Sequence, residues 1–203
     1  MHQRLARNSR DLAVLVLLDL SQSTNDWVPS AGTSVLNLAR EATALVAHAM
    51  DQLGDDFAIH GFDSNGRHDV EYYRFKDFDE PYGEQARARL AGMRGQLSTR
   101  MGTALRHAGR FLRTRHTAHR LILLVTDGEP HDIDVHDKQY LVFDTKRAVG
   151  DQRPHGISTF CLSLDPAADQ YVTRIFGARN YMVLDQLKRL PEKLPALYLR
   201  LTR

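Results

Sequence analysis

The chain has 203 residues, of which 42% are hydrophobic and 26% charged, a composition that excludes an intrinsically disordered protein and suits one globular core. Its net charge of +2 gives no strong case for binding nucleic acid. The single cysteine, Cys161, excludes an internal disulfide and a cysteine metal site. Neither a signal peptide nor an apolar run of about 18 residues is evident, so we expect a cytoplasmic protein without membrane insertion.

The first ten residues are polar and basic and lack periodicity, so we expect residues 1–10 to be a linker or the start of an excised fragment and residues 11–203 to form one domain. From Asp11 onward, apolar runs of strand length alternate with segments of helical period, which is typical of parallel strands joined by crossover helices. The predicted strands are 12–18, 56–62, 70–75, 120–126, 157–162 and 180–184. The predicted helices are 33–50, 82–92, 103–114, 138–153, 167–176 and 191–201.

The first predicted helix, in "TSVLNLAREATALVAHAM", is amphipathic. Its expected buried stripe consists of Val35, Leu38, Ala42, Leu45, Val46 and Ala49. Thr33 stands where a residue capping the helix start is expected.

The segment "DSNGRHD" separates the strands 56–62 and 70–75. It is too short for a parallel crossover and rich in Asn and Gly, so it predicts an antiparallel edge strand over 70–75. The fold class expected is therefore α/β: a doubly wound, mostly parallel six-stranded sheet with one antiparallel edge strand and helices on both faces. Such sheets bind ligands at the carboxyl ends of their strands.

Oxygen-bearing residues gather at these strand ends. Asp19, Ser21 and Ser23 follow the first strand, Thr103 begins a helix after a polar loop, and Asp127 follows the strand 120–126. These five residues offer only hard oxygen ligands, which suits Mg²⁺ or Mn²⁺ and disfavours zinc. Two carboxylates balance a divalent charge, while three hydroxyls add coordination without charge, so the metal can accept a carboxylate from a protein partner.

Three motifs carry a family resemblance: "DLSQST", the threonine of "MGTALRHA" and "TDGEP". Together they resemble the metal-ion-dependent adhesion site (MIDAS) of the von Willebrand factor type A (VWA) fold, which is Rossmann-like. The resemblance assigns the metal to Asp19, Ser21, Ser23, Thr103 and Asp127.

Within that superfamily, "LVTDGEPHDIDVHDKQYLVFDTKRAV" and "LPALYLRL" are similar to the C-terminal domain of NorD and CbbO proteins. Those proteins accompany MoxR-type AAA+ ATPases of the NorQ and CbbQ kind. The resemblance implies a non-catalytic adaptor that recruits a target, such as Rubisco or nitric oxide reductase, to the ATPase for activation or remodelling. An acidic residue of the partner would complete the metal site.

Three further residues are candidates for contacting a partner. Arg94 and Arg100 flank the Thr103 loop and as a set could hold an acidic partner near the metal, although for each arginine alone a solvated basic loop is the favoured explanation. Trp27 follows Ser23 closely and is either an interface anchor on the same rim or a core residue.

The run "EPHDIDVHD" raises the question of a second metal site, with His131, Asp132, Asp134, His136 and Asp137 as its candidate ligands. It lacks the glycine and the terminal glutamate of an EF-hand loop. We therefore favour aspartates that cap the next helix.

Two alternatives to the binding module stay open. The first is a magnesium-dependent phosphohydrolase, which also uses an aspartate after the first strand of an α/β sheet. That chemistry calls for a second carboxylate two residues later as general acid, whereas this chain has Ser21, and it has no Walker-type phosphate loop. The second alternative is a structural VWA domain with an unoccupied metal site.

Overall fold

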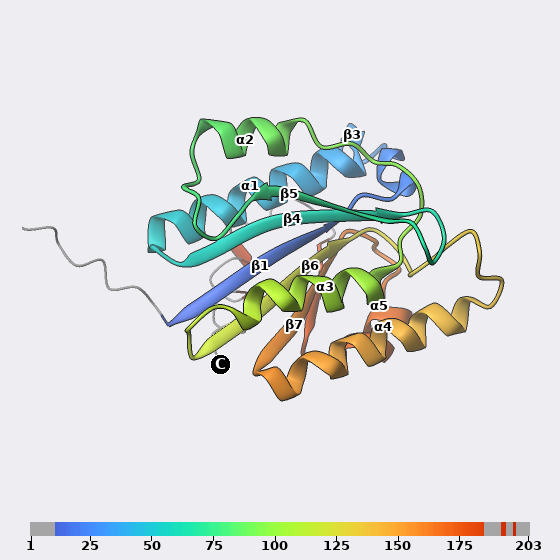
Figure 1. Cartoon of the computed structure of the whole chain (residues 1–203). Coiled ribbons are helices and arrows are strands. Elements are labelled where there is room, and N and C mark those ends of the chain that lie inside the picture. Colours follow the sequence, from blue (N-terminus) through green and yellow to red (C-terminus); the bar gives the residue numbers. More distant parts are fainter. Residues whose placement is uncertain (1–10, 185–191, 194–196, 198–203) are drawn as a thin grey trace, which may run out of the picture.

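A six-stranded sheet forms the centre of the computed structural model, which describes residues 11–184, 192, 193 and 197. The strand order is β5-β4-β1-β6-β7-β8 (Figure 1). These strands are β1 (Leu12–Asp19), β4 (Asp56–Ser64), β5 (Val70–Lys76), β6 (His119–Thr126), β7 (Ile157–Ser163) and β8 (Tyr181–Val183). Neighbouring strands are parallel except β4 and β5, which are antiparallel. The predicted sheet is therefore confirmed.

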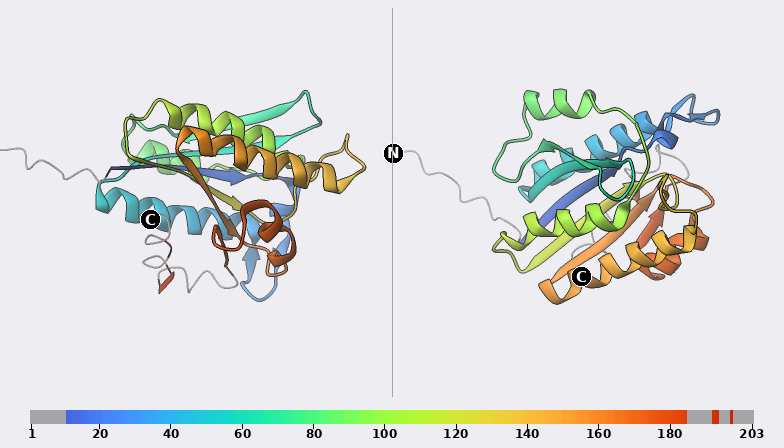
Figure 2. Two further views of the ribbon diagram at one scale, coloured as in Figure 1. Left: turned by 90° about the horizontal axis from the view of Figure 1, so that it is seen from below. Right: turned by 45° about the vertical axis from the view of Figure 1, so that its right-hand side comes forward.

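Helices cover both faces of the sheet. They are α1 (Val35–Leu53), α2 (Glu84–Ala91), α3 (Met101–Arg113), α4 (Lys138–Gln152) and α5 (Asp169–Phe176). One hydrophobic cluster joins α1 and α2 to one face, and a second joins α3, α4 and α5 to the other. Figure 2 shows α1 across the sheet from α3 and α4. Among the described residues, no helix is long and apolar enough to cross a membrane.

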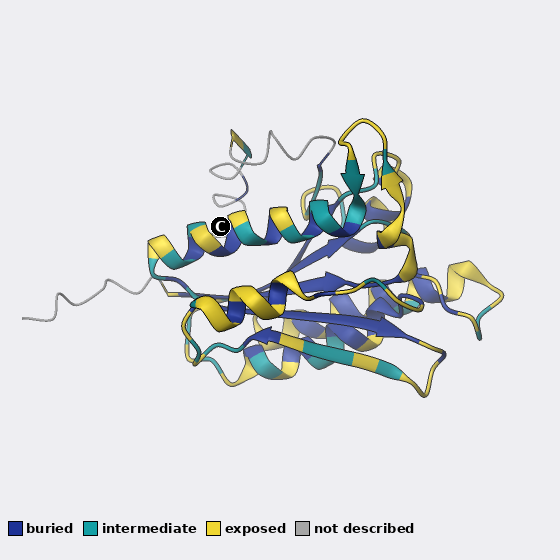
Figure 3. Cartoon of the chain, turned by 90° about the horizontal axis from the view of Figure 1, so that it is seen from above, coloured by how far each residue is buried: buried dark blue, intermediate teal, exposed yellow. Residues whose placement is uncertain are grey.

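The central strand β1 is an uninterrupted apolar run because it is covered on both sides. All of its residues are buried, and Figure 3 shows the central strands dark blue beneath helices whose outer faces are exposed. The cluster under α1 and α2 takes Leu12, Val14, Val16 and Leu18, and the opposite cluster takes Ala13, Leu15 and Leu17. Successive strand residues point to opposite faces, so a strand buried on both faces needs apolar side chains at every position.

The buried stripe of α1 differs from the predicted one. It consists of Leu36, Ala39, Ala42, Thr43, Val46, Ala47 and Met50. Only Ala42 and Val46 belong to both stripes, and Leu45 is 37% exposed. The helix is rich in apolar residues, so two stripes one position apart both satisfy the helical period, and packing against the sheet selects between them.

The start of α1 also corrects the predicted cap. The side chain of Ser34, not Thr33, accepts a hydrogen bond from the backbone N of Asn37, at 3.3 Å. Thr33 instead belongs to a small hairpin, β2 (Trp27–Val28) and β3 (Thr33–Ser34), that the apolar pattern did not predict.

Helix α3 begins at Met101, so Thr103 lies inside the helix and does not cap it. The predicted linker 1–10 lies outside the described residues. Of the predicted helix 191–201, only residues 192, 193 and 197 are described, and Leu197 is buried in the cluster on the α1 face.

Candidate metal centre

Two carboxylates lie at the ends of adjacent parallel strands. Asp19 is the last residue of β1, and Asp127 directly follows β6. The register pairs Leu18 with Val125, so both strands end at the same edge of the sheet, on the right of Figure 1. The charge of Asp19 helps to raise the pKa of Asp127, as expected for two carboxyls that are close in space. This carboxyl edge is where open α/β sheets bind ligands.

The buried carboxyl of Asp19 is held from two sides. Its Oδ1 accepts a hydrogen bond from the backbone N of Ser21 at 3.0 Å, and its Oδ2 accepts one from the hydroxyl of Thr126 at 2.7 Å. Burial raises the pKa of Asp19, while the hydroxyls of Thr126, Ser21 and Thr99 oppose this rise because they stabilise the charged form. These two hydrogen bonds therefore fix the orientation of the carboxyl.

A short 3-10 helix, η1 (Gln22–Asn25), turns the chain after β1 and brings two serine hydroxyls together. The hydroxyl oxygens of Ser21 and Ser23 are 3.1 Å apart. The backbone N of Gln22 donates to the carbonyl of Leu97 at 2.9 Å and so ties this turn to the loop before α3. The hydroxyl of Ser23 also hydrogen-bonds Asp127 and lowers its pKa, so the serines connect the two carboxyls.

The carboxyl of Asp127 has a strongly raised pKa. Burial raises its pKa to about 7, with the nearby charge of Asp19 as the second cause and the hydroxyl of Ser23 as a partial offset. Its Oδ1 is buried and has no hydrogen-bond partner among the described residues. A buried carboxylate oxygen without a donor, beside a second carboxyl, is the environment that a cation stabilises.

The threonine that meets these groups is Thr99, and not the predicted Thr103. Thr103 is exposed on α3. Thr99 is buried in the loop before the helix, and its hydroxyl is close enough to Asp19 to lower the pKa of that carboxyl. Its Oγ1 has no hydrogen-bond partner of good geometry among the described residues. The sequence offered a signal for it, since Ser98 and Thr99 are consecutive hydroxyl residues just before the helix begins at Met101.

The structure thus gathers a set of oxygen groups, namely the carboxyls of Asp19 and Asp127 and the hydroxyls of Ser21, Ser23 and Thr99. Such hard ligands suit Mg²⁺ or Mn²⁺. No cluster of three or more His, Cys, Asp or Glu side chains competes for a metal within the described part of the chain. The residues present therefore fit a divalent cation held by two charged and three neutral ligands.

Comparison with known proteins identifies the family to which this fold belongs. Residues 13–190 match the model of the von Willebrand factor type A domain. The chain belongs to this family. The NorD protein of Brucella melitensis biotype 1 is 35% identical over 198 residues, which cover 98% of this chain and 31% of that protein. NorD of Stutzerimonas stutzeri is 37% identical over 186 residues, covering 92% of this chain and 30% of that protein.

This VWA domain therefore spans less than a third of the length of either NorD relative. Among solved structures, the manganese-loaded TRAP protein of Plasmodium vivax has a similar fold, with a TM-score of 0.65 and 14% identity over 93% of this chain and 73% of that chain. At that identity, the likeness concerns the fold alone.

Arg100 does not lie on the surface of the VWA domain, contrary to its predicted contact with a partner. Its side chain is 7% exposed, and its Nε forms an ion pair of 2.8 Å with Oδ2 of Asp132, whose side chain is fully buried. Its Nη2 also pairs with Oδ1 of Asp134. The sequence could not reveal this burial, because both acids lie more than thirty residues further along the chain.

The other two predicted contact residues are exposed. Trp27 is 65% exposed on the β2–β3 hairpin just after η1, so it is not a core residue. Arg94 is exposed in the loop after α2 and lines a mainly apolar pocket of about 180 Å³. The other lining residues are Leu20, Tyr73, Phe75, Gly92, Met93 and Gln96.

The acidic loop 131–137 is engaged in structural contacts. Asp137 caps α4, since its side chain accepts a hydrogen bond of 2.9 Å from the backbone N of Gln139. Asp132 and Asp134 bind Arg100 as described, and Asp134 also pairs with Arg67 at 3.0 Å. The predicted capping role is confirmed for Asp137, and the two other aspartates serve as partners of arginines.

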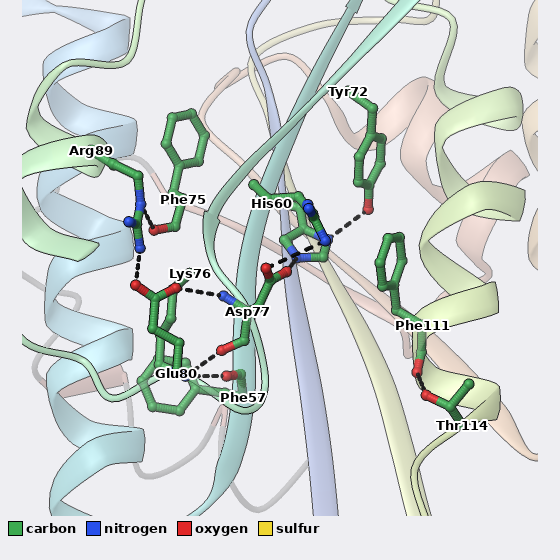
Figure 4. A network of polar contacts seen from close by, with 11 residues as sticks. Phe57, His60, Tyr72, Phe75, Lys76, Asp77, Glu80, Arg89, Phe111 and Thr114 are labelled. Atoms are coloured by element: carbon green, nitrogen blue, oxygen red, sulfur yellow. Dashed lines mark hydrogen bonds and ion pairs between the residues drawn. The ribbon is translucent and has the colours of Figure 1, made fainter. Parts of the chain in front are cut away.

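A second polar network lies between β4 and β5, away from this edge, and the sequence pattern did not predict it. Figure 4 shows His60 between two partners: its Nδ1 is 2.9 Å from the hydroxyl of Tyr72, and its Nε2 is 3.1 Å from Oδ1 of Asp77. Burial lowers the pKa of His60 to about 4, and the attraction of Asp77 offsets only part of this effect. The histidine is therefore neutral at physiological pH.

Proposed function

We propose that this VWA domain is a non-catalytic module that binds a protein partner through Mg²⁺, with Mn²⁺ as a substitute. The metal would be held by the two carboxyls and three hydroxyls named above, with Thr99 in the place first assigned to Thr103. One observation carries the proposal. Oδ1 of Asp127 and Oγ1 of Thr99 are buried and have no hydrogen-bond partner of good geometry among the described residues, and both groups lie near the carboxyl of Asp19. The manganese-loaded TRAP protein supports it as a metal-bound protein of similar fold.

The ligand set explains why such a metal would bind a partner. Asp19 and Asp127 together balance a divalent charge, whereas the hydroxyls contribute oxygens without charge. Magnesium prefers about six oxygen ligands and retains water where the protein supplies fewer. An Asp or Glu side chain of another protein can replace such a water, so the domain would recognise an exposed acidic residue.

The similarity to NorD suggests where this binding takes place. We propose that the domain works beside a MoxR-type AAA+ ATPase of the NorQ or CbbQ kind. It would recruit a target such as nitric oxide reductase or Rubisco to that ATPase for activation or remodelling. Either the target or the ATPase would supply the acidic residue.

We favour binding over phosphohydrolase chemistry on the basis of Ser21. It occupies the position, two residues after Asp19, at which the phosphohydrolase mechanism needs a carboxylic acid. A serine hydroxyl is a poor proton donor at neutral pH. Turnover of a generic aryl phosphate by the wild type, lost in Asp19→Asn, would reverse this preference.

Calorimetric titration with Mg²⁺ and Mn²⁺ tests the metal site. We expect the wild type to bind one equivalent, Asp19→Ala to bind none, and Thr99→Ala to bind roughly tenfold or more weakly. Thr103→Ala is the matched control, since its side chain is exposed on α3, and it should bind like the wild type. Weaker binding by Thr103→Ala alone would contradict the assignment to Thr99.

A pull-down tests the partner. The immobilised domain is incubated with a lysate that contains the ATPase and candidate targets, in Mg²⁺ or in chelator. We expect retention of one of these proteins in Mg²⁺ and its loss with chelator or with Asp19→Ala. Retention that neither chelator nor the substitution changes would contradict metal-dependent binding.

A further inference from the structure

Backbone hydrogen bonds join three loops at the carboxyl edge of the sheet. Ser64, the last residue of β4, exchanges two such bonds with Ser98, at 2.9 and 2.8 Å. Thr99 exchanges two with His131, at 2.8 and 3.1 Å. The loop that carries Thr99 is therefore held between the β4–β5 turn and the loop that follows Asp127.

One buried carboxylate links all three loops through side-chain bonds. Asp132 accepts hydrogen bonds from the hydroxyl of Ser64 at 2.9 Å, from the backbone N of Gly66 at 2.8 Å and from the backbone N of Ile133 at 2.7 Å. Its fourth donor is Nε of Arg100, at 2.8 Å. Four donors on a fully buried side chain satisfy this carboxylate completely, so its position is tightly defined.

Arg100 connects Asp132 to the loop that carries Thr99. It directly follows Thr99, and its backbone N donates to the hydroxyl of Ser64 at 3.1 Å. Its guanidinium is buried against Asp132 and Asp134. Ion pairs of this kind tolerate few alternative arrangements, because any displacement leaves a buried charge without its partner.

We propose that the Arg100–Asp132 pair is a positioning element that holds Thr99 toward Asp19 and thereby sets the affinity of the site for its divalent cation. The proposal rests on the metal site of the proposed function, and it assigns to Arg100 a role in metal affinity instead of partner contact. Outer residues that orient metal ligands change metal affinity by about 10- to 100-fold when they are substituted.

A purely structural role for the pair is the competing explanation, and the chain offers a matched control. Arg106 joins α3 to α4 through ion pairs with Asp144 at 2.8 Å and Asp151 at 3.1 Å. It uses the same guanidinium–carboxylate chemistry from within α3 but makes none of the loop contacts described above. Arg106→Met should therefore alter stability without altering metal affinity.

The experiment compares Arg100→Met, Asp132→Asn, Arg100→Lys and Arg106→Met with the wild type. Calorimetry measures Mn²⁺ affinity, and amide hydrogen exchange without metal measures the mobility of residues 98–100 and 131–133. We expect Arg100→Met and Asp132→Asn to bind Mn²⁺ at least about tenfold more weakly and to exchange faster in both segments. Arg100→Lys should recover part of the affinity, and Arg106→Met should match the wild type in both measurements.

Unchanged affinity in folded Arg100→Met, or an equal loss in Arg106→Met, overturns the proposal. If Arg100→Met does not fold, Asp134→Ala removes the more exposed partner of Arg100 and should weaken Mn²⁺ binding in the same direction. A wild type that binds no Mn²⁺ refutes the proposed function instead. In that case hydrogen exchange still decides whether the pair orders the Thr99 loop, and unchanged exchange overturns that role.

Discussion

The hydroxyl of Thr126 donates a hydrogen bond of 2.7 Å to Oδ2 of Asp19 and so joins the last residue of β6 to the last residue of β1. Both residues are buried, and the same hydroxyl lies 3.2 Å from the carbonyl of Gly128, in the turn that follows Asp127. Thr126 therefore links the carboxyl of Asp19 to the turn that carries Asp127, although it is not a candidate ligand itself.

Thr126→Val should lower both stability and metal affinity. Valine has nearly the same shape but cannot donate to Asp19, so a buried carboxyl oxygen loses its partner. We expect the free energy of unfolding to fall by about 1–3 kcal/mol, as measured by urea denaturation. Mn²⁺ affinity should fall by about tenfold, because Asp19 loses its fixed orientation.

Thr159→Val is the control for this substitution. Thr159 is buried on β7, but its hydroxyl has no hydrogen-bond partner among the described residues. Replacing that hydroxyl with a methyl group should leave stability unchanged or raise it. A loss of stability in Thr159→Val as large as that in Thr126→Val would show that the bond to Asp19 is not the cause.

Asp127→Asn should separate stability from metal binding. The substitution removes a charge that is buried beside Asp19, so the metal-free protein should become more stable at pH 8 by roughly 2 kcal/mol or more, since one pKa unit corresponds to about 1.4 kcal/mol. The same change removes half of the charge that balances the cation. Thermal unfolding with chelator and with Mg²⁺ measures both effects.

For the wild type we expect Mg²⁺ to raise the melting temperature, and for Asp127→Asn we expect no such rise. An equal Mg²⁺ response in the two proteins would mean that Asp127 does not contribute to the site. Lower stability of metal-free Asp127→Asn would mean that burial and the charge of Asp19 do not destabilise the Asp127 carboxylate as its raised pKa implies.

The candidate site residues that the sequence pattern could locate are those at the ends of strands. Asp19 and Asp127 follow apolar runs, and a run long enough to be a buried strand also marks the edge of the sheet. The sequence placed Thr103 at the entrance of the helix, but the helix begins slightly earlier, at Met101, and the threonine that interacts with Asp19 is Thr99 in the preceding loop. Helix starts without a capping side chain give weak sequence signals.

The burial of Arg100 was unpredictable for a different reason. An arginine in a polar loop has the same local pattern whether it is solvated or buried. Its partner Asp132 lies beyond α3 and β6, and only the folded sheet brings the two loops together. Contacts between distant loops carry no periodicity, and this limits sequence reasoning about positioning residues more than about ligands at strand ends.

Stability should depend on pH through His60. Its pKa is about 4 in the folded protein and about 6.5 in an unfolded chain, so between these values the unfolded state binds the proton more readily. Stability from this residue is complete above pH 6.5 and is lost as the pH falls toward 4. The loss amounts to about 3 kcal/mol, since one pKa unit corresponds to about 1.4 kcal/mol.

The unfolding free energy at pH 7 and at pH 4.5, measured in urea, tests this dependence. His60→Gln retains a donor and an acceptor for Tyr72 and Asp77 but does not titrate, so its stability should change less over this interval. His48→Gln, at an exposed position on α1, should behave like the wild type. An identical pH dependence of wild type and His60→Gln would assign the acid sensitivity to other groups.

Trp27 should matter for partner binding and not for folding. Its ring is 65% exposed on the hairpin beside η1, which carries Ser23, so Trp27→Ala should change the free energy of unfolding by less than about 0.5 kcal/mol. Exposed tryptophans near the centre of an interface often contribute more than about 1 kcal/mol to binding. We therefore expect at least about fivefold weaker recovery of the metal-dependent partner in the pull-down.

Phe143→Ala provides the comparison, because Phe143 is 64% exposed on α4, where it makes up part of a different surface. If both substitutions weaken recovery equally, exposed apolar area in general drives the association. If only Trp27→Ala does so while Mn²⁺ affinity stays at the wild-type value, the partner contacts the hairpin beside the metal and reaches the ion with its own carboxylate.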